Sequence, residues 1–379
     1  MTAEVQLELW SCRVKIVFYG KALCKPYVTG VERVGYELIV ALAARDDVEV
    51  VIVAPATVRH KLPDDVKTVV IPLLNDISFF FLFGFFARLF RADWILTPNS
   101  LPCLLSLGVP QAVCVHDTAW SFFRRSFTPL QRRYLVAAHW LTARLATLVY
   151  CPSQASADDY VRLFKYRRKL VVTPWGSDHF EPHDAGVATR FLRECHGIDP
   201  EQQPVVVTIG TLQPRKGYGT VIAALRAAPY PVLYVIFGKR GWMSEAIEAE
   251  IAAFNRDRPG GSRILWVGDA ADALISSMLA VARLFVLASE YEGFGLPVVE
   301  AMRCGCAVAI ADNSSLKELV IAGQWSFPTG DSERLLAIIE TATSDEAELG
   351  RQRDLGRQAA ARFTWDKAAR LLLSQMESA

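Results

Sequence analysis

Blocks of apolar residues alternate along the chain with segments of helical periodicity. The run RVKIVFYG, residues 13–20, is apolar and ends in glycine, which predicts a buried strand. Residues 31–46 then place Val34 and Leu38 on one face of a predicted helix. Residues 48–55, VEVVIVAP, predict the next strand. A strand, a helix and a strand in this order indicate a parallel sheet.

The pattern continues through the first half, stops at the polar, turn-rich segment 177–186, and then restarts. Further strands are predicted at residues 93–98, 111–117, 147–153, 170–176, 204–211, 231–238, 263–269, 283–289 and 307–312. We therefore predict an α/β protein with two Rossmann-like, doubly wound parallel-sheet domains, residues 1–183 and 184–362. The segment 363–379 predicts a final amphipathic helix. In such sheets ligands bind beyond the carboxyl ends of the strands.

Charge argues against a nucleic-acid partner, because the formal net charge of the 379 residues is only +1. The distribution is uneven. Residues 1–183 hold 21 Lys and Arg against 16 Asp and Glu, and residues 184–379 hold 20 against 24. The excess is sharpest between residues 101 and 183, with ten basic and five acidic residues. This basic region either faces an anionic surface or ligand or is ordinary scatter.

Cysteine usage indicates a reducing compartment. The eight cysteines are scattered, and Cys304 and Cys306 form the one close pair. Because no second pair lies at zinc-binding spacing, we expect reduced thiols and no metal site. The first dozen residues lack the features of a signal peptide. Together these features predict a cytoplasmic protein.

The most apolar stretch is SFFFLFGFFARLF, residues 78–90. It is shorter than the roughly 20 residues that span a bilayer. One interpretation is a buried helix of the first domain. The other is an interfacial helix over residues 78–91 that dips its phenylalanines into a membrane and keeps Arg88 and Arg91 at the headgroups.

Residues 292–300, EGFGLPVVE, place a carboxylate on each side of a predicted helix start, Glu292 and Glu300. Gly293 and Gly295 let backbone amides approach a ligand. The free amides and the positive end of the helix favour an anion there.

A carboxylate repels phosphate but accepts hydrogen bonds from hydroxyl groups, so this loop suits a ligand with a phosphate flanked by hydroxyl-rich rings. A nucleotide sugar is such a ligand. Glu292 would then hold the sugar and Glu300 the ribose. The plainer alternative makes Glu292 a surface residue and Glu300 a first-turn partner of the helix dipole.

A second strand end carries cations. In GTLQPRKG, residues 210–217, Arg215 can grip a diphosphate with two hydrogen bonds and Lys216 adds a point charge. A solvated basic turn is the alternative. The segment VHD places His116 at the carboxyl end of a strand of the first domain, where it would act as a hydrogen-bonding group or proton carrier, or simply as a satisfied buried histidine.

Two further residues, Thr29 and Gly30, open the first helix in the segment YVTG. They would contact donor phosphate or acceptor, or they serve only to cap the helix.

With these segments assembled, the chain resembles the retaining glycosyltransferases of family four, which have the GT-B fold. EGFGLPVVE matches the family's pattern of two glutamates separated by seven residues, and GTLQPRKG and VHD match its arginine–lysine and histidine elements. Two departures are present: Gly217 stands where asparagine is common, and PWGSDH, residues 174–179, replaces the usual P-N-G-V-D.

The resemblance implies metal-independent transfer with retention, in a cleft with the donor on the second domain and the acceptor on the first. It also implies that the final helix crosses back to the first domain. The catalytic residues it implies are Glu292, His116, Arg215 and Lys216. The donor-binding residues it implies are Arg215, Lys216, Gly293, Phe294, Gly295, Leu296, Glu300, Thr29 and Gly30.

Donor and acceptor are inferred from the same resemblance. FGKRGW, residues 237–242, resembles a segment of bacterial enzymes that use GDP-mannose or dTDP-rhamnose in surface-polysaccharide assembly. We favour GDP-mannose as donor and a glycan or polyprenyl-linked glycan as acceptor, at the inner face of the cell membrane. The alternatives are a UDP- or dTDP-sugar transferase, a sugar-nucleotide epimerase of the same fold, and a non-catalytic supporting subunit.

Overall fold

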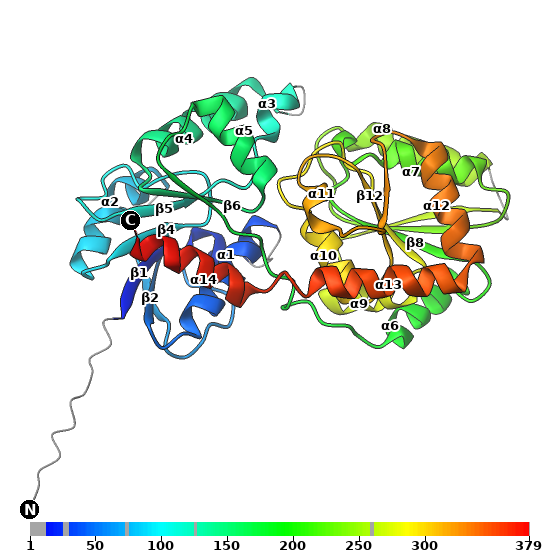
Figure 1. Cartoon of the computed structure of the whole chain (residues 1–379), viewed down its shortest axis with the longest axis horizontal. Coiled ribbons are helices and arrows are strands. Elements are labelled where there is room, and N and C mark those ends of the chain that lie inside the picture. The colour runs from blue at the N-terminus through cyan, green and yellow to red at the C-terminus, as the bar shows by residue number, and fades with distance from the viewer. Residues whose placement is uncertain (1–12, 26–29, 73–75, 125–126, 258–260, 379) are drawn as a thin grey trace, which may run out of the picture.

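Two lobes, each built on one parallel sheet, make up the molecule (Figure 1). The computed structural model describes residues 13–25, 30–72, 76–124, 127–257 and 261–378. Thr29 lies outside these residues, as do the side chains of Phe79 and Phe80.

The first sheet has the order β3-β2-β1-β4-β5-β6-β7, with every pairing parallel. Its strands are β1 (Val14–Tyr19), β2 (Val48–Ala54), β3 (Lys67–Val70), β4 (Trp94–Thr97), β5 (Gln111–Cys114), β6 (Leu148–Cys151) and β7 (Lys169–Val172). The strand order reverses direction beside β1, so a crevice opens between the carboxyl ends of β1 and β4.

Both faces of this sheet are buried, which explains the nearly continuous apolar runs in its sequence. In β1, Ile16 and Phe18 pack in the large core that includes Val34 of helix α1 (Val31–Ala43). The alternate residue Val17 packs on the opposite face with Phe83 of helix α2 (Asp76–Leu89). The period of two along the strand thus serves two helical layers.

The second sheet has the order β10-β9-β8-β11-β12-β13 and is also parallel. Its strands are β8 (Val205–Ile209), β9 (Leu233–Phe237), β10 (Arg263–Gly268), β11 (Leu284–Leu287), β12 (Val308–Ala311) and β13 (Trp325–Phe327). Strands β8 and β11 are neighbours, so the loops that follow them meet at one edge.

Helices connect the strands on both faces of each sheet, in the right-handed crossover arrangement of α/β folds. In the first lobe they are α1 (Val31–Ala43), α2 (Asp76–Leu89), α3 (Ala119–Phe122), α4 (Pro129–Leu145) and α5 (Gln154–Phe164). In the second they are α6 (Ala185–Arg190), α7 (Tyr218–Ala227), α8 (Ser244–Asp257), α9 (Asp272–Val281), α10 (Leu296–Arg303), α11 (Leu316–Leu319), α12 (Ser332–Ser344) and α13 (Glu346–Ala360).

The chain passes between the lobes twice, and the two crossings touch. The backbone N–H of Ser177 donates to the carbonyl of Phe363, 3.1 Å away. The last helix, α14 (Trp365–Glu377), then packs against α1 of the first lobe (Figure 1). The fold class predicted from the sequence is confirmed. The exact boundary between residues 183 and 184 stays a prediction.

Candidate active site

A cavity of about 390 Å³ lies between the lobes, at the carboxyl ends of both sheets. The first lobe lines it with residues that include Gly30 and His116. The second lobe lines it with residues that include Lys216, Glu292 and Glu300. The structure therefore brings together residues that lie up to 270 positions apart in the sequence.

Lys216 and Glu292 form a buried ion pair at the ends of two neighbouring strands. The Lys216 Nζ lies 2.5 Å from Glu292 Oε1, and the side chains are only 12% and 10% exposed. Arg215 NH1 lies 3.4 Å from the other carboxylate oxygen and donates to the carbonyl of Tyr291 at 2.8 Å. Ser289 Oγ also donates to Glu292 Oε1, at 2.7 Å. Arg215 is therefore held beside Glu292, and it is not among the described residues that line the cavity.

Burial and charge compete in this cluster. Burial raises the pKa of Glu292, but the neighbouring Lys216 and Arg215 outweigh it and lower that pKa to about 2. Burial lowers the pKa of Lys216, against the attraction of Glu292. Asp117 also lines the cavity and attracts both cations, so Lys216 is the cation of this cluster that an anionic ligand in the cavity would meet.

Gly217 shapes the loop that carries the two cations. It caps α7 in the left-handed region, with φ of 70° and ψ of 25°. A Cβ atom there would lie 2.0 Å from the carbonyl oxygen of Ala288. Asparagine tolerates such a φ, but its Cβ would not fit here, which explains why this chain has glycine at the position.

The segment 293–296 leads from Glu292 into α10. Gly293 touches the first lobe: a Cβ atom there would lie 2.1 Å from the carbonyl oxygen of His116. Gly295 caps the helix and Leu296 begins it. The ring of Phe294 is buried, with its centroid 5.4 Å from that of Trp175. All four residues line the cavity, so the N-terminus of α10 lies at its wall.

Glu300 lies one turn further along α10 and is 7% exposed. His179 Nε2 lies 3.1 Å from its Oε1 atom. The indole N–H of Trp365, the first residue of α14, donates to His179 Nδ1 at 2.9 Å. The PWGSDH segment departs from the family pattern, but nothing in it predicted that its histidine would be the partner of Glu300.

His116 follows β5 on the opposite wall. Its Nε2 lies 2.5 Å from the carbonyl oxygen of Pro98 and must donate to it, because a carbonyl only accepts. Nδ1 is thereby left as an acceptor. Burial lowers the pKa of His116 despite that carbonyl, so the ring is neutral near pH 7. Gly30 caps α1 with φ of 42°.

Contacts across the cavity hold the lobes together. Arg33 of α1 pairs with Asp272 of α9, with a shortest N–O distance of 2.8 Å. Ser153 Oγ donates to the carbonyl of Gly293 at 2.7 Å. The carboxylate of Glu318 accepts from the first two amides of α5, each at 2.8 Å. No sequence pattern predicted these contacts, because each joins elements that are distant along the chain.

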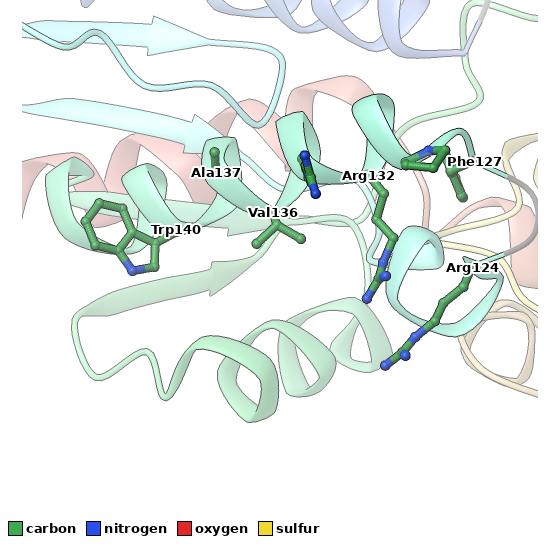
Figure 2. A pocket seen from close by; sticks show the side chains of 8 residues that line it. Arg124, Phe127, Arg132, Val136, Ala137 and Trp140 are labelled. Atoms are coloured by element: carbon green, nitrogen blue, oxygen red, sulfur yellow. The ribbon is translucent and has the colours of Figure 1, made fainter.

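A second hollow, of about 640 Å³, lies on the outer side of the first lobe along α4. It is lined by Arg124, Phe127, Pro129, Arg132, Arg133, Val136, Ala137 and Trp140. Figure 2 shows Arg124 and Arg132 at one end of the hollow and Val136 and Trp140 further along the helix. The segment from 118 to 157 contains five arginines and no acidic residue.

One side of helix α2 also exposes apolar side chains to the surface. Phe83 and Ala87 are buried against the sheet, whereas Phe81, Phe85 and Leu89 are 46%, 54% and 61% exposed. The described part of the stretch 78–90, residues 81–90, thus serves both as core and as apolar surface. Within the described residues, no helix is long and apolar enough to cross a membrane.

Family comparisons match both halves of the chain. Residues 28–179 match the family described as Glycosyltransferase Family 4, and residues 193–362 match Glycosyl transferases group 1. The O-antigen chain mannosyltransferase B of Escherichia coli is 28% identical over 232 residues, which cover 58% of each chain. A D-inositol 3-phosphate glycosyltransferase of Segniliparus rotundus is 30% identical over 221 residues, 56% of this chain and 47% of the relative. The matches thus span about half the length of these relatives.

Solved structures match over almost the whole chain. Anabaena HepE in complex with UDP and glucose superimposes with a TM-score of 0.72 at 20% identity, covering 97% of this chain and 100% of that one. Sucrose-phosphate synthase from Thermosynechococcus elongatus gives a TM-score of 0.76 at 20% identity, covering 97% and 98%. Since both halves match glycosyltransferase families and the whole fold matches two-lobed glycosyltransferases, the chain belongs to the glycosyltransferases with the GT-B fold.

Proposed function

We propose that the protein transfers a hexose, with mannose from GDP-mannose as the favoured donor, to a glycan or lipid-linked glycan, with retention of configuration and without a metal. One observation carries the proposal. The buried Lys216–Glu292 pair joins two neighbouring strand ends at a cavity that both lobes line. Cations, a carboxylate and a helix start meet there, as a sugar diphosphate requires.

In the proposed reaction an acceptor hydroxyl oxygen bonds to the anomeric carbon while the bond from that carbon to the diphosphate breaks, and the hydroxyl proton passes to the departing diphosphate oxygen. Negative charge develops on the departing diphosphate. Arg215, Lys216 and the positive end of the α10 dipole would stabilise this charge. An ammonium group has three N–H donors, so Lys216 can hold Glu292 and a phosphate oxygen together.

The remaining residues would bind the donor around that diphosphate. Glu292 would accept hydrogen bonds from sugar hydroxyls, and Glu300 would do the same for the ribose. His116 would face the sugar as a neutral hydrogen-bonding group, because its Nδ1 is an acceptor. Gly30 and Thr29 would contact donor phosphate or acceptor.

We further propose that the first lobe meets an anionic membrane, where a lipid-linked acceptor resides. The support is the exposed apolar side of α2 together with the arginine-rich hollow of α4 (Figure 2). Arginine beside exposed aromatic and aliphatic side chains suits an interface of lipid headgroups. Co-sedimentation with vesicles of phosphatidylglycerol should exceed that with phosphatidylcholine, and the double variant F85S/W140S should reduce it. Equal sedimentation with both lipids would contradict this proposal.

Support for mannose comes from the named function of the E. coli relative, and the UDP bound to HepE favours a UDP-sugar as the second candidate. A thermal-shift screen with GDP, UDP and dTDP tests the two. A ligand at a hundred times its dissociation constant adds about 2.7 kcal/mol of stability. Stabilisation by GDP alone would support GDP-mannose as the donor. Stabilisation by UDP or dTDP would instead indicate a UDP- or dTDP-sugar as the donor.

The screen is followed by measuring release of the selected nucleotide from its sugar, with and without a membrane extract as acceptor source. We expect release by the wild type and none by Glu292→Ala. If no nucleotide stabilises the protein and none is released, the chain is a non-catalytic subunit. Release that does not depend on Glu292 would overturn the assigned role.

A further inference from the structure

The ring of His179 lies behind Glu300 and not in the cavity. Of the described residues, His179 is not among those that line the cavity, whereas Glu300 is. The histidine and glutamate side chains are 5% and 9% exposed. A ligand in the cavity would therefore contact Glu300 and reach His179 only through it.

The hydrogen bonds define the state of this histidine. The indole N–H of Trp365 can only donate, so His179 Nδ1 must carry the lone pair. The ring is then neutral, and its proton is on Nε2, which faces Glu300 Oε1 at 3.1 Å. The direction of donation is thus fixed, from Trp365 to His179 to Glu300.

The two hydrogen bonds from Trp365 to His179 and from His179 to Glu300, called the relay below, connect the cavity to both crossings between the lobes. His179 belongs to the first crossing, and Trp365 begins α14, the helix that packs on the first lobe. The backbone N–H of Trp365 also donates to Asp178 Oδ1, at 2.9 Å. Because both partners of His179 are buried and held by packed elements, the imidazole has little freedom to turn.

We propose that His179 is a positioning residue that fixes the carboxylate of Glu300 for the two ribose hydroxyls of the donor nucleotide. One oxygen is held by the imidazole N–H, which sets the plane of the carboxylate and presents the other oxygen to the cavity. This inference rests on the proposed function, because it takes Glu300 as the ribose ligand. It goes beyond that function by assigning nucleotide recognition to a residue of the interlobe connection.

The test compares a ribonucleotide with its analogue that lacks both hydroxyls. Isothermal titration measures the affinity for GDP and for 2′,3′-dideoxy-GDP, or for the uridine pair if the screen selects UDP. The variants are His179→Phe, His179→Gln and Trp365→Phe. His183→Phe is the matched control, since His183 lies in the same connection and its Nδ1 faces the carbonyl of Glu181 instead.

In the wild type the ribonucleotide should bind more tightly than the dideoxy analogue. In His179→Phe we expect ribonucleotide affinity to fall about tenfold while analogue affinity stays unchanged, so the preference collapses. Glutamine carries an acceptor oxygen beside a donor NH₂ group, so His179→Gln should retain most of the preference. Trp365→Phe should lower ribonucleotide affinity roughly threefold, because the tautomer of His179 is no longer fixed.

The two possible failures are distinguishable. A wild type that binds both nucleotides equally overturns the ribose role of Glu300 and with it that part of the proposed function. A wild-type preference that survives unchanged in His179→Phe overturns the positioning role alone. If His179→Phe does not fold, the comparison of His179→Gln with Trp365→Phe decides, and equal preferences in both would contradict the relay.

Discussion

Lys216 Nζ and Glu292 Oε1 lie 2.5 Å apart at the ends of two neighbouring strands, and both side chains are nearly buried. Removing Glu292 leaves Lys216 nearly buried without its counterion, which destabilises a protein by about 3–5 kcal/mol, whereas removing Lys216 leaves Glu292 with Arg215 alone. The pair is thus both a stability element and the centre of the proposed site.

Lys216→Ala keeps Arg215 beside Glu292, so it should lower the free energy of unfolding by about 1–3 kcal/mol, and it should abolish sugar transfer. Urea denaturation and a nucleotide-release assay measure the two effects. Lys317→Ala is the control, because Lys317 is 57% exposed and lies 3.7 Å from Asp312 at the surface. A fully active Lys216→Ala protein would contradict the proposed role of the cation.

The low pKa of Glu292 predicts a pH dependence. Its ordinary value of 4.5 falls to about 2 in the folded state, so the ionised carboxylate stabilises the fold above pH 4.5. This contribution is lost as the pH falls from about 4.5 towards 2. Urea denaturation between pH 6 and pH 3 should show a steeper loss of stability for the wild type than for Glu292→Gln. Parallel profiles would refute the assigned shift.

Substituting Gly217 should distort the cation loop. Gly217→Asn introduces the residue that is common in the family. It should still lower the free energy of unfolding by about 1–3 kcal/mol, because its Cβ would meet the Ala288 carbonyl oxygen. Gly219→Ala is the matched control two residues further on, where the nearest atom to an added Cβ is 3.8 Å away. Thermal unfolding compares them, and an asparagine variant as stable as the wild type would show that this loop can shift.

The Arg33–Asp272 pair should stabilise the observed packing of the two lobes against each other. Asp272 is 50% exposed, so the pair is worth no more than about 1 kcal/mol. Asp272→Arg should weaken donor binding several-fold, and the charge-swapped double variant R33D/D272R should recover part of the loss. Titration calorimetry with the donor nucleotide measures this. Failure of the swap to recover binding would show that Arg33 acts on the ligand and not through Asp272.

Local sequence was sufficient for much of the fold. Apolar runs such as residues 13–20 and 204–211 predicted parallel strands, because a strand that is buried on both faces is apolar at nearly every position. The short edge strands β3 and β13 were not predicted, since β3 is partly exposed and polar. The sequence also identified Glu292, Arg215, Lys216 and His116 as candidates, because charged residues directly after buried strands are brought to one edge of a sheet.

Only the tertiary structure decided how these residues pair. Which cation neutralises Glu292, which carbonyl Gly293 packs against and which partner Glu300 finds all depend on the docking of elements far apart in sequence. His179 shows this most clearly, because its neighbours in the chain give no sign of Trp365, which lies 186 residues later. Sequence alone determines periodicity and local charge, whereas burial, distances and hydrogen-bond directions are set only when elements that are distant in sequence pack together.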